Sequence, residues 1–176
     1  MLILRFLFAL LLITQLNAVT KLYLLPDEHQ EALSALIKNI NNAKKEIHVA
    51  IYSFTHRKIS KALANAAAKG VKVTLYFDHD SNYKNRRSQI AYLAKLKNVQ
   101  TYTLKGRKSK NGKYYGKMHM KLITIDQKIL FLGSANWSYS AFGLSYETLF
   151  YSDEKKWIKK TDSYLQSFKK QSKKYF

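Results

Sequence analysis

The hydrophobic and polar positions along the chain predict helices and strands that follow one another. Apolar side chains recur at helical spacing over residues 27–40 and again over residues 55–70, where Gly70 ends the second segment. Short apolar runs, rich in β-branched and aromatic residues, predict strands at residues 46–54, 71–77, 99–104, 118–125, 129–132 and 146–151. A further helix is expected near residues 88–96, and a lysine-rich amphipathic helix at the C-terminus. Strands separated by helices predict an α/β fold, with a central sheet covered by helices on both faces.

Residues 1–18 differ from the rest of the chain and form a separate segment. One charged residue, Arg5, precedes an apolar run at residues 6–13, and Ala18 is a small residue at a plausible cleavage point. This combination is typical of a secretory signal peptide. The alternative is an uncleaved membrane anchor, with Arg5 near one interface because a full span needs about 20 apolar residues. Both alternatives place residues 19–176, which we expect to form one domain, outside the cytoplasm.

The composition describes a folded and strongly basic protein. The 176 residues include 31 Lys and Arg against 11 Asp and Glu, which gives a formal net charge of +20. Hydrophobic residues make up 47% of the chain, enough to build a core, so the chain is not a disordered polycation. The absence of cysteine excludes disulfides, thiolate metal sites and a cysteine nucleophile. A folded body this basic is expected to bind a polyanion, either nucleic acid or an anionic membrane.

Candidate chemistry gathers between residues 117 and 151. His119 and Lys121 alternate in a predicted strand, so their side chains point the same way. An imidazole and an ammonium group side by side at the end of an apolar strand are costly unless paired, and together they suit a phosphate. Ser134 and Asn136 follow the next predicted strand, where they can stabilise charge in a phosphoryl-transfer transition state. Glu147, one strand further on, can orient the imidazole and favour its charged form.

The spacing of these residues resembles a known pattern. It matches the H-x-K-x4-D and G-S-x-N motifs of the phospholipase D superfamily, and Glu147 matches the downstream acidic residue of that family. With its length and single motif, the chain is most similar to the small bacterial endonucleases of the NucT type. The resemblance implies a phospholipase D-like nuclease domain over residues 19–176, with a mixed central sheet and with no metal ion or other cofactor. The matching residues are His119, Lys121, Asp126, Gly133, Ser134 and Asn136.

The resemblance also implies a two-step mechanism. A His119 imidazole attacks phosphorus and forms a covalent phosphohistidine, while a second His119 protonates the leaving oxygen and then activates water. Lys121, Ser134 and Asn136 bind phosphoryl oxygens, and Glu147 sets the tautomer of the nucleophile. Asp126 belongs to the catalytic motif, but the tight turn at residues 126–128 by itself favours Asp, so we lean towards a structural role. One motif supplies one histidine, and a two-fold homodimer with facing His119 side chains supplies the second.

Residues 105–117 lead directly into the predicted His119 strand. They include six basic residues, no acidic residue, three glycines and two adjacent tyrosines. The alternatives are a solvated flexible loop and a groove that follows a nucleic-acid strand, with cations on phosphates and tyrosines stacked on bases; the position favours the groove. The predicted substrate-binding residues are Lys105, Arg107, Lys108, Lys110, Lys113, Tyr114, Tyr115 and Lys117. The eight lysines between residues 155 and 174 fit a solvated face as well as a nucleic-acid or membrane contact.

The remaining histidines are expected to have structural or surface positions. His48 lies inside an apolar strand, where packing or a backbone hydrogen bond is expected. His29 and His56 fall in first helical turns, where surface positions are expected. Residues 78–80 (Asp-His-Asp) are metal-ligand types in a row, but consecutive residues rarely converge on one ion, so we expect them to cap a strand end.

Together these patterns predict a metal-independent, sequence-non-specific endonuclease outside the cytoplasm. Its expected substrate is DNA, with a preference for single strands and with RNA as an alternative. No sequence specificity is expected, because nothing in the sequence is built for base readout. A second hypothesis is a phospholipase D or cardiolipin-type phosphodiesterase on anionic lipid, with membrane association through the N-terminus. A third is a non-catalytic nucleic-acid-binding protein, against which the intact motif argues.

Overall fold

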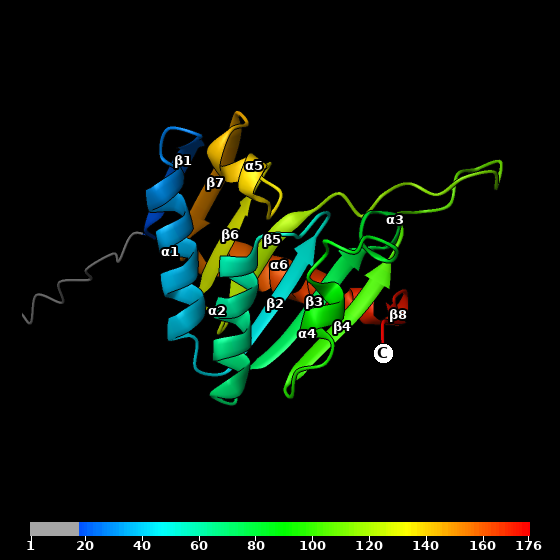
Figure 1. Cartoon of the computed structure of the whole chain (residues 1–176), viewed down its shortest axis with the longest axis horizontal. Helices are drawn as coiled ribbons and strands as arrows, with labels where there is room; N and C mark the ends of the chain where they lie inside the picture. The colour runs from blue at the N-terminus through cyan, green and yellow to red at the C-terminus, as the bar shows by residue number, and fades with distance from the viewer. Residues whose placement is uncertain (1–17) are drawn as a thin grey trace, which may run out of the picture.

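The computed structural model describes residues 18–176, which form one eight-stranded mixed sheet between two layers of helices (Figure 1). The predicted signal or anchor, apart from Ala18, lies outside the described residues. The strands are β1 (Thr20–Leu25), β2 (Glu46–Ile51), β3 (Lys72–Asp78), β4 (Val99–Leu104), β5 (Lys121–Ile125), β6 (Ile129–Gly133), β7 (Glu147–Ser152) and β8 (Lys173–Lys174). Their order across the sheet is β1-β7-β6-β5-β2-β3-β4-β8. The β2, β3 and β4 strands are parallel, and every other neighbouring pair is antiparallel.

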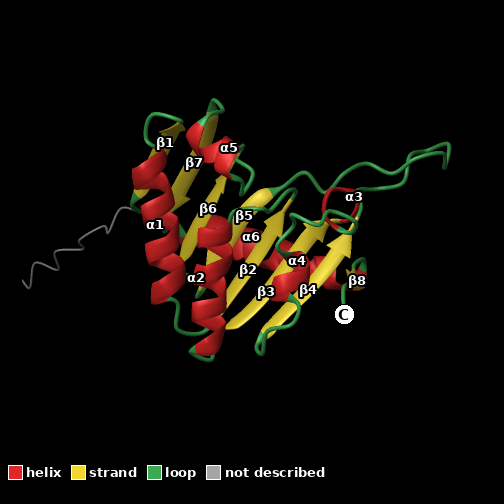
Figure 2. Ribbon diagram, viewed as in Figure 1, coloured by secondary structure: helices red, strands yellow, loops and turns green. Residues whose placement is uncertain are grey.

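Helices cover both faces of this sheet, which confirms the predicted α/β fold. The helices are α1 (His29–Asn42), α2 (Arg57–Ala68), α3 (His79–Asn82), α4 (Ile90–Leu93), α5 (Tyr139–Gly143) and α6 (Lys155–Ser167). The α1 and α2 helices lie on one face with α4 and α5, and α6 lies on the other (Figure 2). Within residues 18–176, no helix is both long enough and apolar enough to span a membrane.

The packing on the α6 face includes a buried polar pair. Apolar residues of the sheet contact Leu165 and Phe168 at the end of α6. Beside them, His48 Nδ1 in β2 lies 2.6 Å from Asp162 Oδ1 in α6, and Thr124 donates to the same carboxylate at 2.9 Å. The predicted packing role of His48 is therefore incomplete, because its ring pairs with a helix carboxylate rather than with the backbone.

The strand directions bring five chain segments to one edge of the sheet. The β2 and β3 strands are parallel and both end at this edge, and β5 is antiparallel to β2, with Ile51 opposite Lys121. The β6 strand ends at the same edge and β7 starts there, because β5, β6 and β7 pair in antiparallel order. This edge is where the sequence places its candidate catalytic residues.

Two predicted elements differ from the structure, and some observed elements, such as β1 and β8, were not predicted. The β1 strand was not expected, because it lies between the apolar N-terminal segment and Pro26 and shows only a short alternation of buried and exposed residues. The expected strand at residues 118–125 begins only at Lys121, and the expected helix at residues 88–96 is reduced to the single turn of α4. Short elements and element ends depend on tertiary packing for stability, and their sequence signal is correspondingly weak.

Candidate active site

The centre of the site is the contact between His119 and Lys121. The Lys121 Nζ atom lies 3.1 Å from each ring nitrogen of His119 and donates to the His119 carbonyl oxygen at 3.0 Å. His119 lies just before β5 rather than inside a strand, and its side chain is exposed, whereas Lys121 is 7% exposed. The contact predicted from strand alternation is present, although the strand starts three residues later than expected.

Backbone hydrogen bonds hold the segment that carries His119. The Tyr52 amide donates to the Met120 carbonyl at 2.8 Å, which extends the pairing of β2 and β5 beyond their ends. The Met118 amide donates to Asp78 Oδ2 at 3.0 Å. Asp78 is buried at the end of β3, and its other oxygen accepts the Ser81 amide and caps α3. Of the three residues expected to cap the strand end, Asp78 is the one that does so, at the junction of β3 with α3, and its carboxylate also holds the segment that carries His119.

The turn after β6 presents Ser134 towards the same edge. The Gly133 backbone passes so close to the Thr148 carbonyl that a Cβ atom there would collide with it. Ser134 and Thr148 are joined twice: the Ser134 amide donates to the Thr148 carbonyl at 3.1 Å, and the Thr148 amide donates to Ser134 Oγ at 2.9 Å. Because Oγ already accepts this bond, its own proton is directed elsewhere and can reach an anionic oxygen.

Asn136 has one end of its amide buried. Its Oδ1 atom is buried and has no hydrogen-bond partner among residues 18–176. The Nδ2 group is therefore the end of the amide that is left accessible to a ligand. The next residue, Trp137, is fully buried against Phe54, with 4.9 Å between ring centroids, and its amide donates to the Ser53 carbonyl at 3.0 Å. This anchor fixes Asn136 relative to the end of β2.

The surrounding charges favour a neutral imidazole. Burial and the positive charges of Lys121 and Lys117 lower the pKa of His119 below its ordinary value, against the opposing effect of Asp78 and Glu147. The pKa of Lys121 is lowered by burial, and Glu147 opposes that change as well. Glu147, the first residue of β7, thus raises the pKa of His119 as predicted, but burial and the two lysines lower it by more. An imidazole that is neutral near pH 7 is the form required of a nucleophile.

Tyr52 is a site residue that the motif did not indicate. Its ring lies 4.3 Å from the His119 ring, centroid to centroid and tilted by 60°, and Lys121 Nζ lies 5.0 Å from the same tyrosine ring. Its hydroxyl accepts a hydrogen bond from Lys117 Nζ at 3.1 Å. Hydrogen bonds with Ser81 and Lys117 lower the pKa of Tyr52. The sequence signal was only positional, since Tyr52 sits in the run read as a buried strand.

Asp126 lies at the opposite end of β5 from Lys121 and is not part of this edge. Its carboxylate accepts the backbone amides of Lys44, Lys45 and Glu46 at 2.8, 2.8 and 3.0 Å, and its φ of 53° is the left-handed conformation that Asp tolerates. These contacts are structural, which agrees with the structural role favoured by the turn in the sequence: Asp126 ties the start of β2 to the turn after β5.

Residues 105–117 form a two-stranded arm that extends away from the body (Figure 1). Gly106 and Gly116 pair near its base at 2.8 Å, and Ser109 pairs with Tyr114 near its tip at 2.8 Å. A cavity of about 270 Å³ beside His119 is lined at the base of the arm by Lys105, Arg107 and Lys117. The predicted binding residues at the tip, Lys110, Lys113 and Tyr114, do not line this cavity. Of the predicted binding residues, Lys105, Arg107 and Lys117 are therefore the ones that line the cavity beside His119.

His56 does not have the surface position that was expected. It is 1% exposed, because its amide donates to the Trp137 carbonyl and its ring stacks on Tyr139 at 4.1 Å. Burial, together with the charge of Lys58, lowers the pKa of His56 to about 4. His29 is half-buried, with Nδ1 2.9 Å from the Pro26 carbonyl oxygen. Within the described part of the chain, no three His, Asp or Glu side chains are grouped as a metal site.

Comparison with known proteins identifies the family. The family model described as "Cardiolipin synthase, PLD-like domain" matches residues 36–169. The chain belongs to the phospholipase D superfamily. NucT from Helicobacter pylori is 44% identical and superimposes with a TM-score of 0.87, over 89% of this chain and 98% of that one. Nuc from Salmonella typhimurium, a phospholipase D family member, has the same fold at 24% identity, with a TM-score of 0.75 over 90% of this chain and 99% of that one.

A curated relative extends the family to longer proteins. The phospholipase D of Rickettsia prowazekii is 30% identical over 134 residues, which are 76% of this chain and 58% of that protein. This chain therefore spans little more than half the length of that phospholipase D. The predicted superfamily and the likeness to NucT are both confirmed.

Proposed function

We propose that the protein hydrolyses phosphodiester bonds in DNA as a metal-independent, sequence-non-specific endonuclease. The observation that carries this proposal is the contact of the His119 imidazole with the Lys121 ammonium group, beside a cavity lined by further cations. A phosphate is the ligand that suits such a pair. The likeness to NucT over nearly the whole chain and the net charge of +20 support a nucleic-acid substrate.

In the first step the neutral His119 attacks phosphorus. A P–N bond forms as the P–O bond to the leaving nucleoside breaks, and His119 of the partner subunit gives its proton to the leaving oxygen. The non-bridging oxygens are held by the Lys121 ammonium group, the Ser134 hydroxyl and the Asn136 amide. These donors are fixed by the backbone hydrogen bonds described above, so they need little reorganisation as charge develops.

In the second step water breaks the phosphohistidine. His119 of the partner subunit, now neutral, takes a proton from water, and the resulting hydroxide attacks phosphorus as the P–N bond breaks. The released imidazole is neutral again, and the partner imidazole is charged again, so the cycle closes without a metal ion. The two histidines must therefore hold different protonation states before each turnover.

The second histidine requires a homodimer, and an apolar surface next to the site fits one. Leu22, Phe150 and Leu132 stand in a row across β1, β7 and β6 on the α6 face. Leu22 is 52% exposed and Leu132 is 38% exposed, whereas Phe150 between them is half-buried, with its ring 6.0 Å from the Trp157 ring of α6. Leu132 directly precedes Gly133 and Ser134, so this leucine row continues into the site. A second copy related by a two-fold axis can cover the row and bring its own His119 to the same phosphate.

The preference for single strands and the location outside the cytoplasm belong to the same proposal. An exposed basic arm with tyrosines suits unstacked bases, because stacking needs no particular sequence. The N-terminal segment, as a cleaved signal or as an anchor, would carry the domain out of the cytoplasm. In the anchored form, the nuclease would act at a membrane surface.

The deciding experiment compares substrates in excess chelator. Purified protein and His119→Ala are incubated with single-stranded DNA, single-stranded RNA, plasmid DNA and cardiolipin vesicles. We expect single-stranded DNA to be cleaved fastest by the parent protein and not at all by His119→Ala. Cleavage that needs added metal, or that survives in His119→Ala, would overturn the mechanism. Hydrolysis of cardiolipin without cleavage of DNA would instead assign the lipid activity that the family description and the Rickettsia relative suggest.

A further inference from the structure

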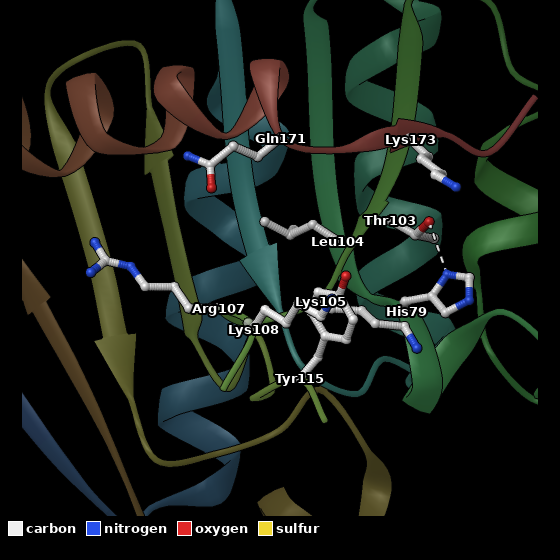
Figure 3. Close-up of a pocket in the computed structure, with 10 residues that line it drawn as sticks. His79, Thr103, Leu104, Lys105, Arg107, Lys108, Tyr115, Gln171 and Lys173 are labelled. Carbon is white, nitrogen blue, oxygen red and sulfur yellow. Dashed lines mark hydrogen bonds between the residues drawn. The ribbon is translucent and has the colours of Figure 1, made fainter. Parts of the chain in front are cut away.

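A second and larger cavity lies beyond the one beside His119. Its volume is about 580 Å³, within the usual range of ligand pockets. The base of the arm lines one side with Lys108 and Tyr115, and the C-terminal segment lines the other with Gln171 and Lys173 (Figure 3). The two cavities adjoin, since both are lined by Leu104, Lys105, Gly106, Arg107 and Gln171. A nucleic-acid strand bound at His119 can therefore continue into the larger cavity, which we call the flanking cavity.

The flanking cavity combines positive charge with an aromatic ring. Its lining includes four cationic side chains and no acidic one: Lys105, Arg107, Lys108 and Lys173. Asp80 lies at the rim and pairs with Lys105 at 2.9 Å, so the other cations carry the net charge. Lys108 Nζ lies 6.0 Å and Lys105 Nζ 5.8 Å from the centre of the Tyr115 ring. A phosphate on the ammonium groups would thus have an aromatic ring close by.

The C-terminal segment is held in place to form the far wall. Lys173 and Lys174 form β8, which pairs with β4 through Thr103 and Tyr102. Lys173 lines the flanking cavity, whereas Lys174 lines a different one, with Gln100 and Thr101. On the same wall, Thr103 Oγ1 lies 3.3 Å from His79 Nδ1 (Figure 3). Two adjacent lysines on one short strand therefore serve different surfaces.

We propose that the flanking cavity binds a nucleotide of the substrate strand next to the scissile phosphate. Its phosphate is held by Lys108 and Lys173, and its base stacks on Tyr115. This subsite rests on the proposed nuclease function, and it gives the last residues of the chain a part in substrate binding. It also separates the two adjacent tyrosines of the arm, because Tyr115 lines the cavity and Tyr114 does not.

The charge contribution is tested by salt dependence. The affinity of an oligothymidylate of about 12 nucleotides is measured at several salt concentrations, in the His119→Ala background so that nothing is cleaved. We expect Lys173→Ala to weaken binding and to reduce the slope of log K against log salt by about 0.7, the contribution of one phosphate contact on a single strand. The matched control is Lys174→Ala, which removes the neighbouring charge and should keep the parent slope. Equal slopes for the two variants would overturn the subsite.

The stacking contribution is tested by removing the base as well as the ring. Oligothymidylate and its abasic counterpart are compared in the same background. The ratio of their dissociation constants, abasic over oligothymidylate, measures how much the bases contribute to affinity. We expect Tyr115→Ala to reduce that ratio by about tenfold, because stacking contributes ~1–3 kcal/mol per base. Tyr114→Ala should reduce it less, and Tyr92→Ala, on α4, is the surface control. An equal reduction in Tyr114→Ala would place the stacking on the whole arm and overturn the assignment to the cavity.

The subsite and the nuclease function can fail separately. If the parent protein does not cleave DNA, the proposed function is wrong whatever the binding data show. If it cleaves DNA but the Lys173 and Tyr115 variants bind as the parent does, only the subsite is wrong. Thermal unfolding of each variant confirms that losses come from the cavity and not from misfolding.

Discussion

Lys121 Nζ lies 3.1 Å from both ring nitrogens of His119, and its charge helps to lower the pKa of the imidazole. In the proposed mechanism, the imidazole that attacks phosphorus must be neutral, while the group that holds the phosphate oxygens must be positively charged. The ammonium group meets both needs, because its charge lowers the pKa of the neighbouring imidazole while it stays a cation itself.

The first prediction concerns the pH dependence of catalysis. The pKa of His119 is lowered by burial and by Lys121, so the acidic limb of kcat/KM should have its midpoint below the ordinary value of 6.5. Lys121→Ala removes a positive charge beside the imidazole, which should raise the pKa of His119 and move the midpoint of the acidic limb to higher pH. The variant should also lose about 100-fold or more in kcat/KM through the missing contact to phosphate.

The imidazole can be titrated by NMR in both proteins, in parallel with the kinetics. The shift of the His119 resonance and the shift of the kinetic limb should have the same sign. A limb that does not move in Lys121→Ala, with residual activity high enough to measure, would contradict the assignment of His119 as the neutral nucleophile.

The second prediction concerns Asp126. Asp126→Ala removes the acceptor of three backbone amides, and we expect it to lower the free energy of unfolding by about 2–3 kcal/mol. Because Asp126 lies at the far end of β5, kcat at a temperature where the variant is folded should change little. Urea unfolding and initial rates are the two measurements. Asp126→Asn retains one carbonyl oxygen and tolerates the positive φ, so it should recover part of the stability.

The sequence predicted the site better than it predicted the surroundings of the site. Alternation in a strand and the motif spacing were enough to place His119 beside Lys121 and to put Ser134, Asn136 and Glu147 at the same edge. Tyr52 and Asp78 could not be found in this way, because they lie at the ends of β2 and β3, and only the pairing of β2 with β5 and with β3 brings them to His119. Contacts between segments far apart in the sequence have no local signal.

The incorrect position of His56 has a similar cause. A histidine in a first helical turn is usually exposed, but here the turn that carries Asn136 and Trp137 closes over it. The same turn was predicted as a source of phosphate donors, with no indication that it also packs on the start of α2. Burial of this kind depends on tertiary packing, which overrides the local expectation.

The third prediction concerns the pair that joins α6 to the sheet. Burial disfavours the charged form of His48, but the hydrogen bond and charge of Asp162 outweigh it, and the pKa of His48 is raised. A raised pKa in the folded state adds stability that is fully present below the ordinary value and is lost as pH rises through the folded pKa. The parent protein should therefore lose stability, relative to His48→Gln, as pH rises from the ordinary histidine value of 6.5 through the raised pKa of the folded protein.

Chemical denaturation at several pH values measures this difference. Glu46, whose carboxylate lies 3.9 Å from His48 Nε2, acts in the same direction as Asp162. A stability difference that stays constant over the whole range would show that folding does not shift the pKa of His48.

The fourth prediction concerns the leucine row. Leu132→Asp introduces a charge into a surface that we propose a second copy covers, so the variant should be monomeric in light scattering and inactive. Leu144→Asp is a suitable control, since Leu144 is 80% exposed in the segment after α5, outside this row. A Leu132→Asp dimer with full activity would exclude the row from the interface.

The fifth prediction tests the shared site itself, by mixing subunits. If each active site needs His119 from both subunits, a mixed dimer of parent and His119→Ala protein is inactive. After complete exchange of an equal mixture, only about one quarter of the dimers contain two parent subunits, so the activity should fall to about one quarter of that of the same total protein. If each subunit had an independent active site, the mixture would retain about one half of the activity of the same amount of parent protein. Mixing the parent with Lys61→Ala, a surface change on α2, should preserve the full activity. A linear dependence on the parent fraction, under conditions where exchange is demonstrated, would mean that one histidine performs both steps within a single subunit.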